Sequence, residues 1–208
     1  MMYTNQQQSA LKHISQKVEN FFAQFPVNAH GFDHASRVAH HAAEIATKEY
    51  PEKAFLCEVS GILHDIGRVT EHYTPGNTKR HHELSYELLK QWFVEDSVFD
   101  IFTVEEKKEL LYGIRYHYND GADEYPSAFV LRDADKIDML GPIGLERCCE
   151  FFGDDEKAIM DDMVKKYYCY YWLRTKTARI HVDTEKLMEP VDDFYLPRLR
   201  ASIEDIEL

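Results

Sequence analysis

Apolar residues recur along most of this chain at spacings of three and four residues, which is the period of a helix packed on one face. Runs that alternate apolar and polar residues, as half-buried strands do, are rare. Between residues 5 and 24 the apolar positions are Leu11, Ile14, Val18, Phe21 and Phe22. The pattern therefore predicts an all-α protein whose first helix covers residues 5–24.

Capping residues, prolines and glycines divide the rest of the chain into further helices. Asp33 is placed to cap a helix over residues 34–49, and Pro51 suits the first turn of the next helix, which Gly67 is placed to end. Thr103-Val-Glu-Glu106 is a capping-box pattern. The remaining predicted helices cover residues 81–94, 103–117, 127–139, 142–153 and 154–173, then a weaker helix from about 184, a break from Pro190 to Pro197, and a final short helix.

Two segments have the composition of loops. Residues 68–80 contain Pro75-Gly76-Asn77 and are expected to form a mobile loop over a site, and residues 119–126 form the second loop. No internal repeat or linker interrupts the 208 residues. We therefore expect one domain over residues 1–208, with the C-terminal helices from 154 packed against the rest.

The composition is that of a soluble globular protein, with 44% hydrophobic and 29% charged residues. No apolar run approaches the roughly 20 residues that cross a membrane. The polar, Gln-rich start is unlike a signal peptide, so a cytoplasmic location without membrane contact is expected. The four cysteines form no Cys-x-x-Cys pair, which disfavours a zinc knuckle or a disulfide framework.

The charge balance bears on the partners. There are 37 acidic and 24 basic residues, a net charge of −13, so binding to a nucleic-acid backbone is not expected. A bound metal ion would reverse the local charge, and a small anion could then bind beside it. A small phosphorylated partner is therefore compatible with the composition, and so is an oligomer.

The candidate chemistry begins at His64-Asp65, which lies among Ile62, Leu63 and Ile66. A buried carboxylate is costly unless it is paired or binds a metal. On this dipeptide alone, a core histidine bonded to a carboxylate is the simpler interpretation. Further histidines and aspartates fall on successive predicted helices, namely His34, His81, His82, His117 and Asp135.

Histidine and carboxylate suit zinc, iron, manganese and nickel, and facing helices are a common framework for such sites. Periodicity alone supports this interpretation and scattered histidines on solvated faces about equally. Of the other histidines, His41 lies two turns after His34 and could support it, whereas His72 is either on the surface or facing a substrate. Three are most simply surface residues, His13, His30 and His181.

The order His34, His64-Asp65, Asp135 resembles the HD-domain metal-dependent phosphohydrolase superfamily. His34-Ala-Ser-Arg37-Val38 is similar to the family's His-x-x-Arg-Val. Leu63-His-Asp-Ile-Gly-Arg68 is similar to its Leu-His-Asp-Ile-Gly-Lys/Arg, and Asp133-Ala-Asp-Lys-Ile-Asp138 to its Asp-Ala-Asp-Arg/Lys-Leu-Asp. The small residues that follow, and Arg147, also match, so the resemblance covers about residues 30–150.

The resemblance implies a first divalent metal on His34, His64, Asp65 and Asp135, and a second on His81 and His117. His81 is preferred over His82 because Ser85 fits the spacing of the family's His-x-x-x-Gly/Ser. Asp65 is the natural bridge, since a carboxylate can touch two ions. The metal, one ion or two, is not distinguished among Mn, Fe, Zn, Ni, Co and Mg. Tyr116-His117-Tyr118 lacks the paired histidine and the Gly-Tyr-Pro signature of the cyclic-dinucleotide phosphodiesterase branch.

The implied reaction is metal-dependent hydrolysis of a phosphomonoester or phosphodiester in a small molecule, with a nucleotide as the expected class. Asp138 is within reach to orient a ligand, and Lys136 is expected to neutralise the neighbouring aspartates. Loops 68–80 and 118–126 are expected to line the pocket. Besides Asp65, the residues expected to act on the phosphate, each equally well explained as surface charge, are Arg68, Lys79, Arg80 and Arg115.

Two other functions fit the same ligand set. One is a mixed-valence di-iron oxygenase of the myo-inositol oxygenase type, which the resemblance also covers. The other is a metal-binding regulatory domain without catalysis, in which the tyrosine-rich stretch Tyr167 to Trp172 would form an interface.

Overall fold

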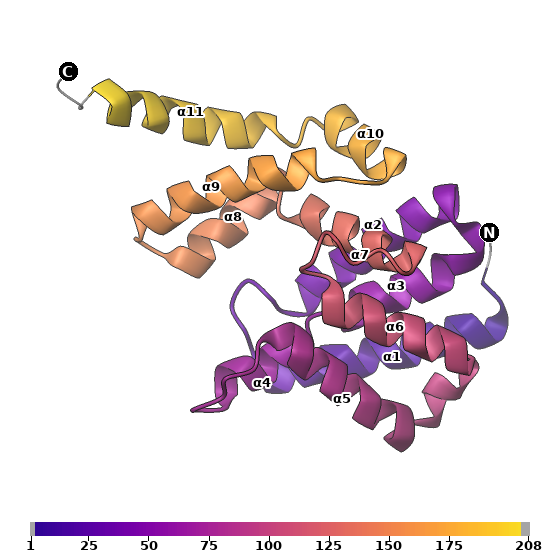
Figure 1. The fold of residues 1–208 in the computed structure, drawn as a ribbon. Coiled ribbons are helices and arrows are strands. Elements are labelled where there is room, and N and C mark those ends of the chain that lie inside the picture. Colours follow the sequence, from indigo (N-terminus) through magenta and orange to yellow (C-terminus); the bar gives the residue numbers. More distant parts are fainter. Residues whose placement is uncertain (1–2, 205–208) are drawn as a thin grey trace.

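The computed structural model describes residues 3–204, and every regular element in that range is a helix (Figure 1). The prediction of an all-α fold is confirmed. The elements are α1 (Asn5–Gln24), α2 (Phe32–Glu49), η1 (Pro51–Lys53), α3 (Ala54–Leu63), α4 (Gly67–Tyr73), α5 (His81–Glu95), η2 (Ser97–Ile101), α6 (Val104–Tyr116), α7 (Pro126–Asp138), α8 (Gly141–Phe152), α9 (Glu156–Tyr171), α10 (Lys176–Thr184) and α11 (Glu189–Glu204). Among these described helices, none is both long and apolar enough to cross a membrane.

The main core is built around α2, which packs on α3 and α7. Val38, Ala39 and Ala42 form the buried stripe of α2. The backbone of α3 comes very close to this stripe at Gly61, where an added Cβ would lie 2.4 Å from Ala39 Cα. The small residues on both sides thus allow α2 and α3 to touch along their backbones, and this contact brings the first turn of α2 beside the end of α3.

A smaller core joins the C-terminal helices. Cys148, Ile159, Met163 and Val191 pack together from α8, α9 and α11. Figure 1 shows these helices and α10 lying along one side of the bundle formed by α1 to α7. Gly153 adopts a φ of 58° and ends α8, as the sequence predicts, and the chain then turns back into α9.

The prediction that one helix runs to Gly67 is wrong. Helix α3 ends at Leu63, residues 64–66 form a turn, and Gly67 begins α4. Gly67 serves a close contact instead of a helix end, because an added Cβ would lie 2.2 Å from the carbonyl oxygen of His81. About half of the segment 68–80, predicted to be a loop, is therefore helical.

Other boundaries test the capping rules. Thr103 and Glu106 form the predicted capping box of α6. The residue that caps α2 is Gly31 and Asp33 lies inside the first turn, so that prediction is wrong. The predicted break from Pro190 to Pro197 is also wrong, since α11 spans it. Pro190 occupies the first turn, where its missing N–H is not needed, and residues 205–208 of the predicted final helix lie outside the described range.

Candidate metal centre

Two pairs of histidines face each other in the interior. In the first pair, the Nε2 atoms of His34 and His64 are 3.2 Å apart, and Asp135 Oδ1 lies 3.4 and 3.8 Å from them. In the second pair, the Nε2 atoms of His81 and His117 are 3.3 Å apart. The four rings come from the start of α2, the turn after α3, the start of α5 and the end of α6. The fold thus brings together residues that the resemblance assigns to one site.

Asp65 lies between the two pairs. Its Oδ2 is 3.7 Å from Nε2 of both His34 and His64. Its Oδ1 is 3.5 Å from Nε2 of His81 and 3.8 Å from that of His117. Each carboxylate oxygen therefore faces one histidine pair. This is the arrangement expected of a carboxylate that bridges two cations.

The hydrogen bonds of the rings indicate which nitrogen carries the proton. His34 Nδ1 lies 2.7 Å from Asp138 Oδ2, a carboxylate oxygen, and the Nδ1 atoms of His64 and His117 lie 2.8 and 2.7 Å from backbone carbonyl oxygens. These oxygens accept, so each Nδ1 donates and each Nε2 is left with a lone pair. Lone pairs that face each other repel unless a cation lies between them. Two nitrogens about 2.1 Å from one ion, at an angle of about 90–110°, are about 3.0–3.4 Å apart, so the residues fit a metal.

The charges agree with that fit. Burial lowers the pKa of His34 and of His117 to about 4, and that of His81 to about 2, so all three rings are neutral at pH 7, as ligation requires. Burial opposes ionisation of Asp65, but Arg68, His64 and His30 hold the pKa of its carboxyl well below the usual range. Oδ1 of this buried carboxylate has no hydrogen-bond partner. A buried anionic oxygen without a partner is what a cation would satisfy.

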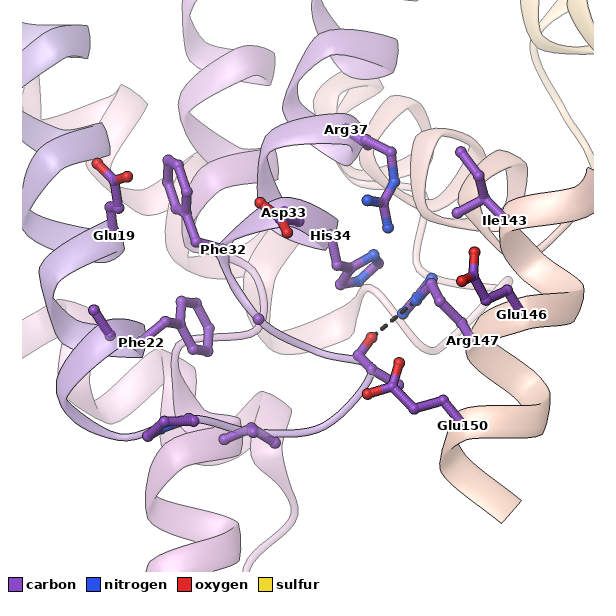
Figure 2. A pocket seen from close by; sticks show the side chains of 15 residues that line it. Glu19, Phe22, Phe32, Asp33, His34, Arg37, Ile143, Glu146, Arg147 and Glu150 are labelled. Carbon is purple, nitrogen blue, oxygen red and sulfur yellow. Dashed lines mark hydrogen bonds between the residues drawn. The ribbon is translucent and has the colours of Figure 1, made fainter. Parts of the chain in front are cut away.

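Asp138 orients His34 and is itself held by two arginines. Arg37 Nε donates to Oδ1 at 2.5 Å, and Arg147 donates to Oδ2 at 2.6 Å. Arg147 also donates from Nε to the carbonyl oxygen of Ala29, at 2.8 Å. Figure 2 shows the side chains of Arg37, His34 and Arg147 pointing toward one another. All three line a cavity of about 550 Å³. Asp138 is thus placed to orient a ring, and the ring that it orients is that of His34.

His30 is not the surface residue that the sequence predicts. Its Nδ1 lies 3.0 Å from Asp65 Oδ2, and its ring packs edge-on against His34, with centroids 5.6 Å apart. The residue lies in the irregular segment before α2, next to Ala29, whose φ is 60°. Helical periodicity says nothing about such a segment, so the only available signal was its nearness in sequence to His34.

The remaining histidines lie outside this cluster. His82 stacks on Tyr118, with ring centroids 4.1 Å apart, and His81 is the one that joins the cluster. His41 packs against His181, with centroids 5.1 Å apart, so His181 is half-buried instead of simply on the surface. His13 is exposed, as predicted, and bonds to Asp96.

The predicted basic residues fall in two groups. Arg68 and Arg80 line a cavity of about 320 Å³ together with Asp65 and Asp135, and Arg68 Nε is 3.3 Å from Asp65 Oδ2. The other two do not line it. Lys79 pairs with Glu87, and Arg115 donates two hydrogen bonds to Glu83, at 2.8 and 2.9 Å.

Lys136 donates a hydrogen bond to Asp120 instead of to the aspartates that neighbour it in the sequence. One of those, Asp133, instead accepts hydrogen bonds from the backbone of Arg174 and Thr175. The ammonium group of Lys136 is therefore paired outside the aspartate cluster, because the side chain leaves α7 toward the loop that follows α6. Its charge still lowers the pKa of Asp133, against the larger opposite effect of burial.

The cavity has a wall that sequence reasoning missed. The segment 68–80 contributes Arg68 and Arg80 as expected, but residues 118–126 contribute nothing to the lining. The opposite wall comes from α8 and α9, through Arg147, Cys148, Phe151, Phe152, Lys165 and Lys166. Among these residues the family resemblance marks only Arg147, and no motif marks the others.

Comparisons with known proteins match the segment that contains both histidine pairs. The family model described as HD domain matches residues 31–140. Ribonuclease Y of Syntrophomonas wolfei is 30% identical over 109 residues, which are 52% of this chain and 18% of that protein. The match thus spans about a fifth of the length of that relative.

Two solved structures have the same fold. Bacillus subtilis YpgQ in complex with ADP aligns over 97% of both chains, with a TM-score of 0.64 and 22% identity. A predicted HD superfamily hydrolase from an uncultured Thermotogales bacterium aligns over 92% of both chains, with a TM-score of 0.63 and 25% identity. The likeness therefore extends beyond residue 140 into the C-terminal helices.

Proposed function

Since this chain belongs to the HD-domain family, we propose that it is a metal-dependent phosphohydrolase that acts on a small phosphorylated molecule. The observation that carries the proposal is the position of Asp65. One of its oxygens faces each histidine pair, and the same carboxylate borders a cavity that also contains Arg68 and Arg80. Cation ligands and phosphate-binding side chains thus meet in one place.

The chemistry follows from that juxtaposition. A bound divalent metal lowers the pKa of water to about 7 and polarises a phosphoryl oxygen. In hydrolysis the water oxygen bonds to phosphorus, the bond from phosphorus to the leaving oxygen breaks, and one proton of the water ends on that oxygen while the other passes to solvent. Arg68 keeps Asp65 ionised and, with Arg80, offsets the charge of the phosphate.

Nucleotides stand first among the substrates to be tested. The B. subtilis protein of the same fold was crystallised with ADP, although at 22% identity this likeness concerns the fold. Because one relative is a ribonuclease, short phosphodiesters are also among the substrates to be tested. The net charge of −13 argues against long nucleic acids.

The test uses the purified chain with Mn²⁺, Ni²⁺ or Co²⁺ and a panel of AMP, ADP, ATP, a dinucleotide and simple phosphomonoesters. We expect hydrolysis that EDTA abolishes and that His64→Ala and Asp65→Asn remove. His40→Ala is the matched control, since His40 is an exposed histidine of α2 and should leave the rate unchanged. Activity that survives both site variants, or no hydrolysis across the panel, would overturn the proposal. Turnover that requires O₂ and two irons would fit the oxygenase instead.

A further inference from the structure

The side chains that line the cavity beside Asp65 include two chemically different sets. One set is charged and contains Asp65, Asp135, Arg68 and Arg80. The other is apolar and contains Met139, Cys148, Phe151 and Phe152. All but Met139 of this apolar set come from α8, beyond the residues that the family model matches. A ligand that fills the cavity with its phosphate at the charged set would therefore also contact α8.

Phe151 is the more exposed of the two aromatic rings in the apolar set. It is 54% exposed, although an exposed ring of this size is unfavourable without a partner. Its edge packs against His30, with ring centroids 5.8 Å apart, and His30 in turn lies 3.0 Å from Asp65. Phe151 is thus one side chain removed from the carboxylate at the centre of the site, and its ring is positioned for contact with a ligand that reaches that carboxylate.

Of the three cations on the same wall, Lys165 has the longest ion pair. Arg147 is engaged by Asp138 and Ala29, and Lys166 is buried and donates to the carbonyl oxygens of Met139 and Gly144. The side chain of Lys165 is 62% exposed, and its nearest carboxylate oxygen, on Asp162, is 3.9 Å away. A loose pair of this kind in solvent is weak. The ammonium group is therefore available to an anionic ligand.

We propose that the α8–α9 wall selects the substrate, with Phe151 packing against a planar apolar part of the leaving group and Lys165 binding a second negative charge on it. The inference rests on the proposed function. It narrows the substrate class to phosphoesters whose leaving group carries both features. The cavity of about 320 Å³ is at the small end of ligand pockets, which limits the ligand to a small molecule.

Three phosphonates test this without turnover, because their carbon–phosphorus bond is not hydrolysed: methylphosphonate, phenylphosphonate and 4-carboxyphenylphosphonate. Binding to the Mn²⁺-loaded chain is measured by titration calorimetry. We expect each added group to tighten binding. Phe151→Ala should weaken phenylphosphonate about fivefold and leave methylphosphonate unchanged, as expected for one ring contact. Lys165→Met should remove the gain from the carboxylate, about threefold, and leave phenylphosphonate unchanged.

Two outward-facing residues of α9 provide matched controls. Tyr168→Ala and Lys157→Met remove an exposed ring and an exposed charge outside the cavity, and both should bind like the wild type. Equal binding of the three phosphonates by the wild type, no binding of any, or unchanged binding by Phe151→Ala and Lys165→Met would overturn the inference. If the preferences hold and no phosphoester is hydrolysed, the proposed function fails and the binding wall stands. If esters are hydrolysed and the preferences are absent, the inference about the α8–α9 wall fails and the proposed function stands.

Discussion

The two histidine pairs differ in how firmly the structure holds them. His64 bonds to a backbone carbonyl, and His34 bonds to Asp138, which two arginines clamp. In the second pair, His117 also bonds to a carbonyl, but the buried Nδ1 of His81 has no hydrogen-bond partner. The nearest carboxylate oxygen to that nitrogen belongs to Glu71, 3.5 Å away. The first pair is thus oriented before any ion binds, whereas one ring of the second is not.

The difference has a structural origin. The first pair is attached to α2 and α3, whose backbones touch at Gly61, and Asp135 comes from α7, which packs on both. The second pair is attached to the ends of α5 and α6. Orienting partners fix the direction and basicity of a ligand, so an ion at the first pair should bind more tightly than one at the second. Asp65 faces both pairs and would therefore contact an ion at either one.

Replacing the shared residue should have the largest effect. Asp65→Asn keeps the shape but removes the anionic oxygens that face both pairs. Loss of an orienting partner alone costs about 10–100-fold in metal affinity, so loss of this ligand should exceed about 100-fold at both positions. Metal analysis after dialysis measures it, with Asp33→Asn, an exposed aspartate of α2, as the control. Two retained equivalents of metal in Asp65→Asn would contradict the bridging role.

Gly61→Ala should destabilise the protein at the contact between α2 and α3, the helices to which the first pair is attached. The added methyl would lie 2.4 Å from Ala39 Cα and must push α2 and α3 apart. Overpacking of this kind destabilises by about 1–3 kcal/mol, and a backbone clash belongs at the upper end of that range. Gly113→Ala is the matched control, because its nearest atom would be at 3.7 Å and alanine favours a helix. Denaturant unfolding compares the two, and equal stability would refute the tight contact.

Replacing a carboxylate that orients a histidine should cost more metal affinity at the first pair than at the second. Asp138→Asn should weaken the first ion by about 10–100-fold, because the amide keeps one neutral acceptor oxygen where His34 and the two arginines share two anionic ones. Glu71→Gln should weaken only the second ion, by about tenfold or less, since its contact with His81 is longer. Competition with a chromophoric chelator measures both affinities. A larger loss in Glu71→Gln would reverse the comparison.

The last effect is on stability instead of metal affinity and concerns a histidine outside both pairs. Burial lowers the pKa of His41 from 6.5 to about 4. Between these values the unfolded chain binds a proton that the folded chain does not, so stability falls as the pH drops from 6.5 to about 4. The slope from one such group is at most about 1.4 kcal/mol per pH unit. His41→Gln should flatten the unfolding free energy over this range, and an unchanged slope would show that His41 titrates normally when folded.

Part of this site could be predicted from the sequence, because its candidate ligands lie in short motifs within helices or directly next to them. His34, His64, Asp65 and Asp135 come from such motifs, and the fold brings them together. His30 escaped because it precedes α2 in an irregular segment. Lys79 and Arg115 were chosen for their nearness in sequence to ligands, yet their side chains leave toward Glu87 and Glu83.

The α8–α9 wall of the cavity could not have been predicted from the sequence. Phe151 and Lys165 reach the cavity only because α8 and α9 fold back over the core. That packing depends on a second hydrophobic cluster from α8, α9 and α11. Contacts between such distant segments have no local pattern in the sequence. Gly67 shows the same limit, since it was interpreted as a helix end and serves a contact between α4 and α5.

An anomalous-difference map from a crystal grown with Mn²⁺ tests the central claim most directly. We expect two peaks about 3.5–4 Å apart, one at His34, His64 and Asp135 and the other at His81 and His117, with Asp65 between them. The peak at the first pair should have the higher occupancy when the metal is limiting. No peak in the cluster, or a single peak that Asp65 does not contact, would contradict the account.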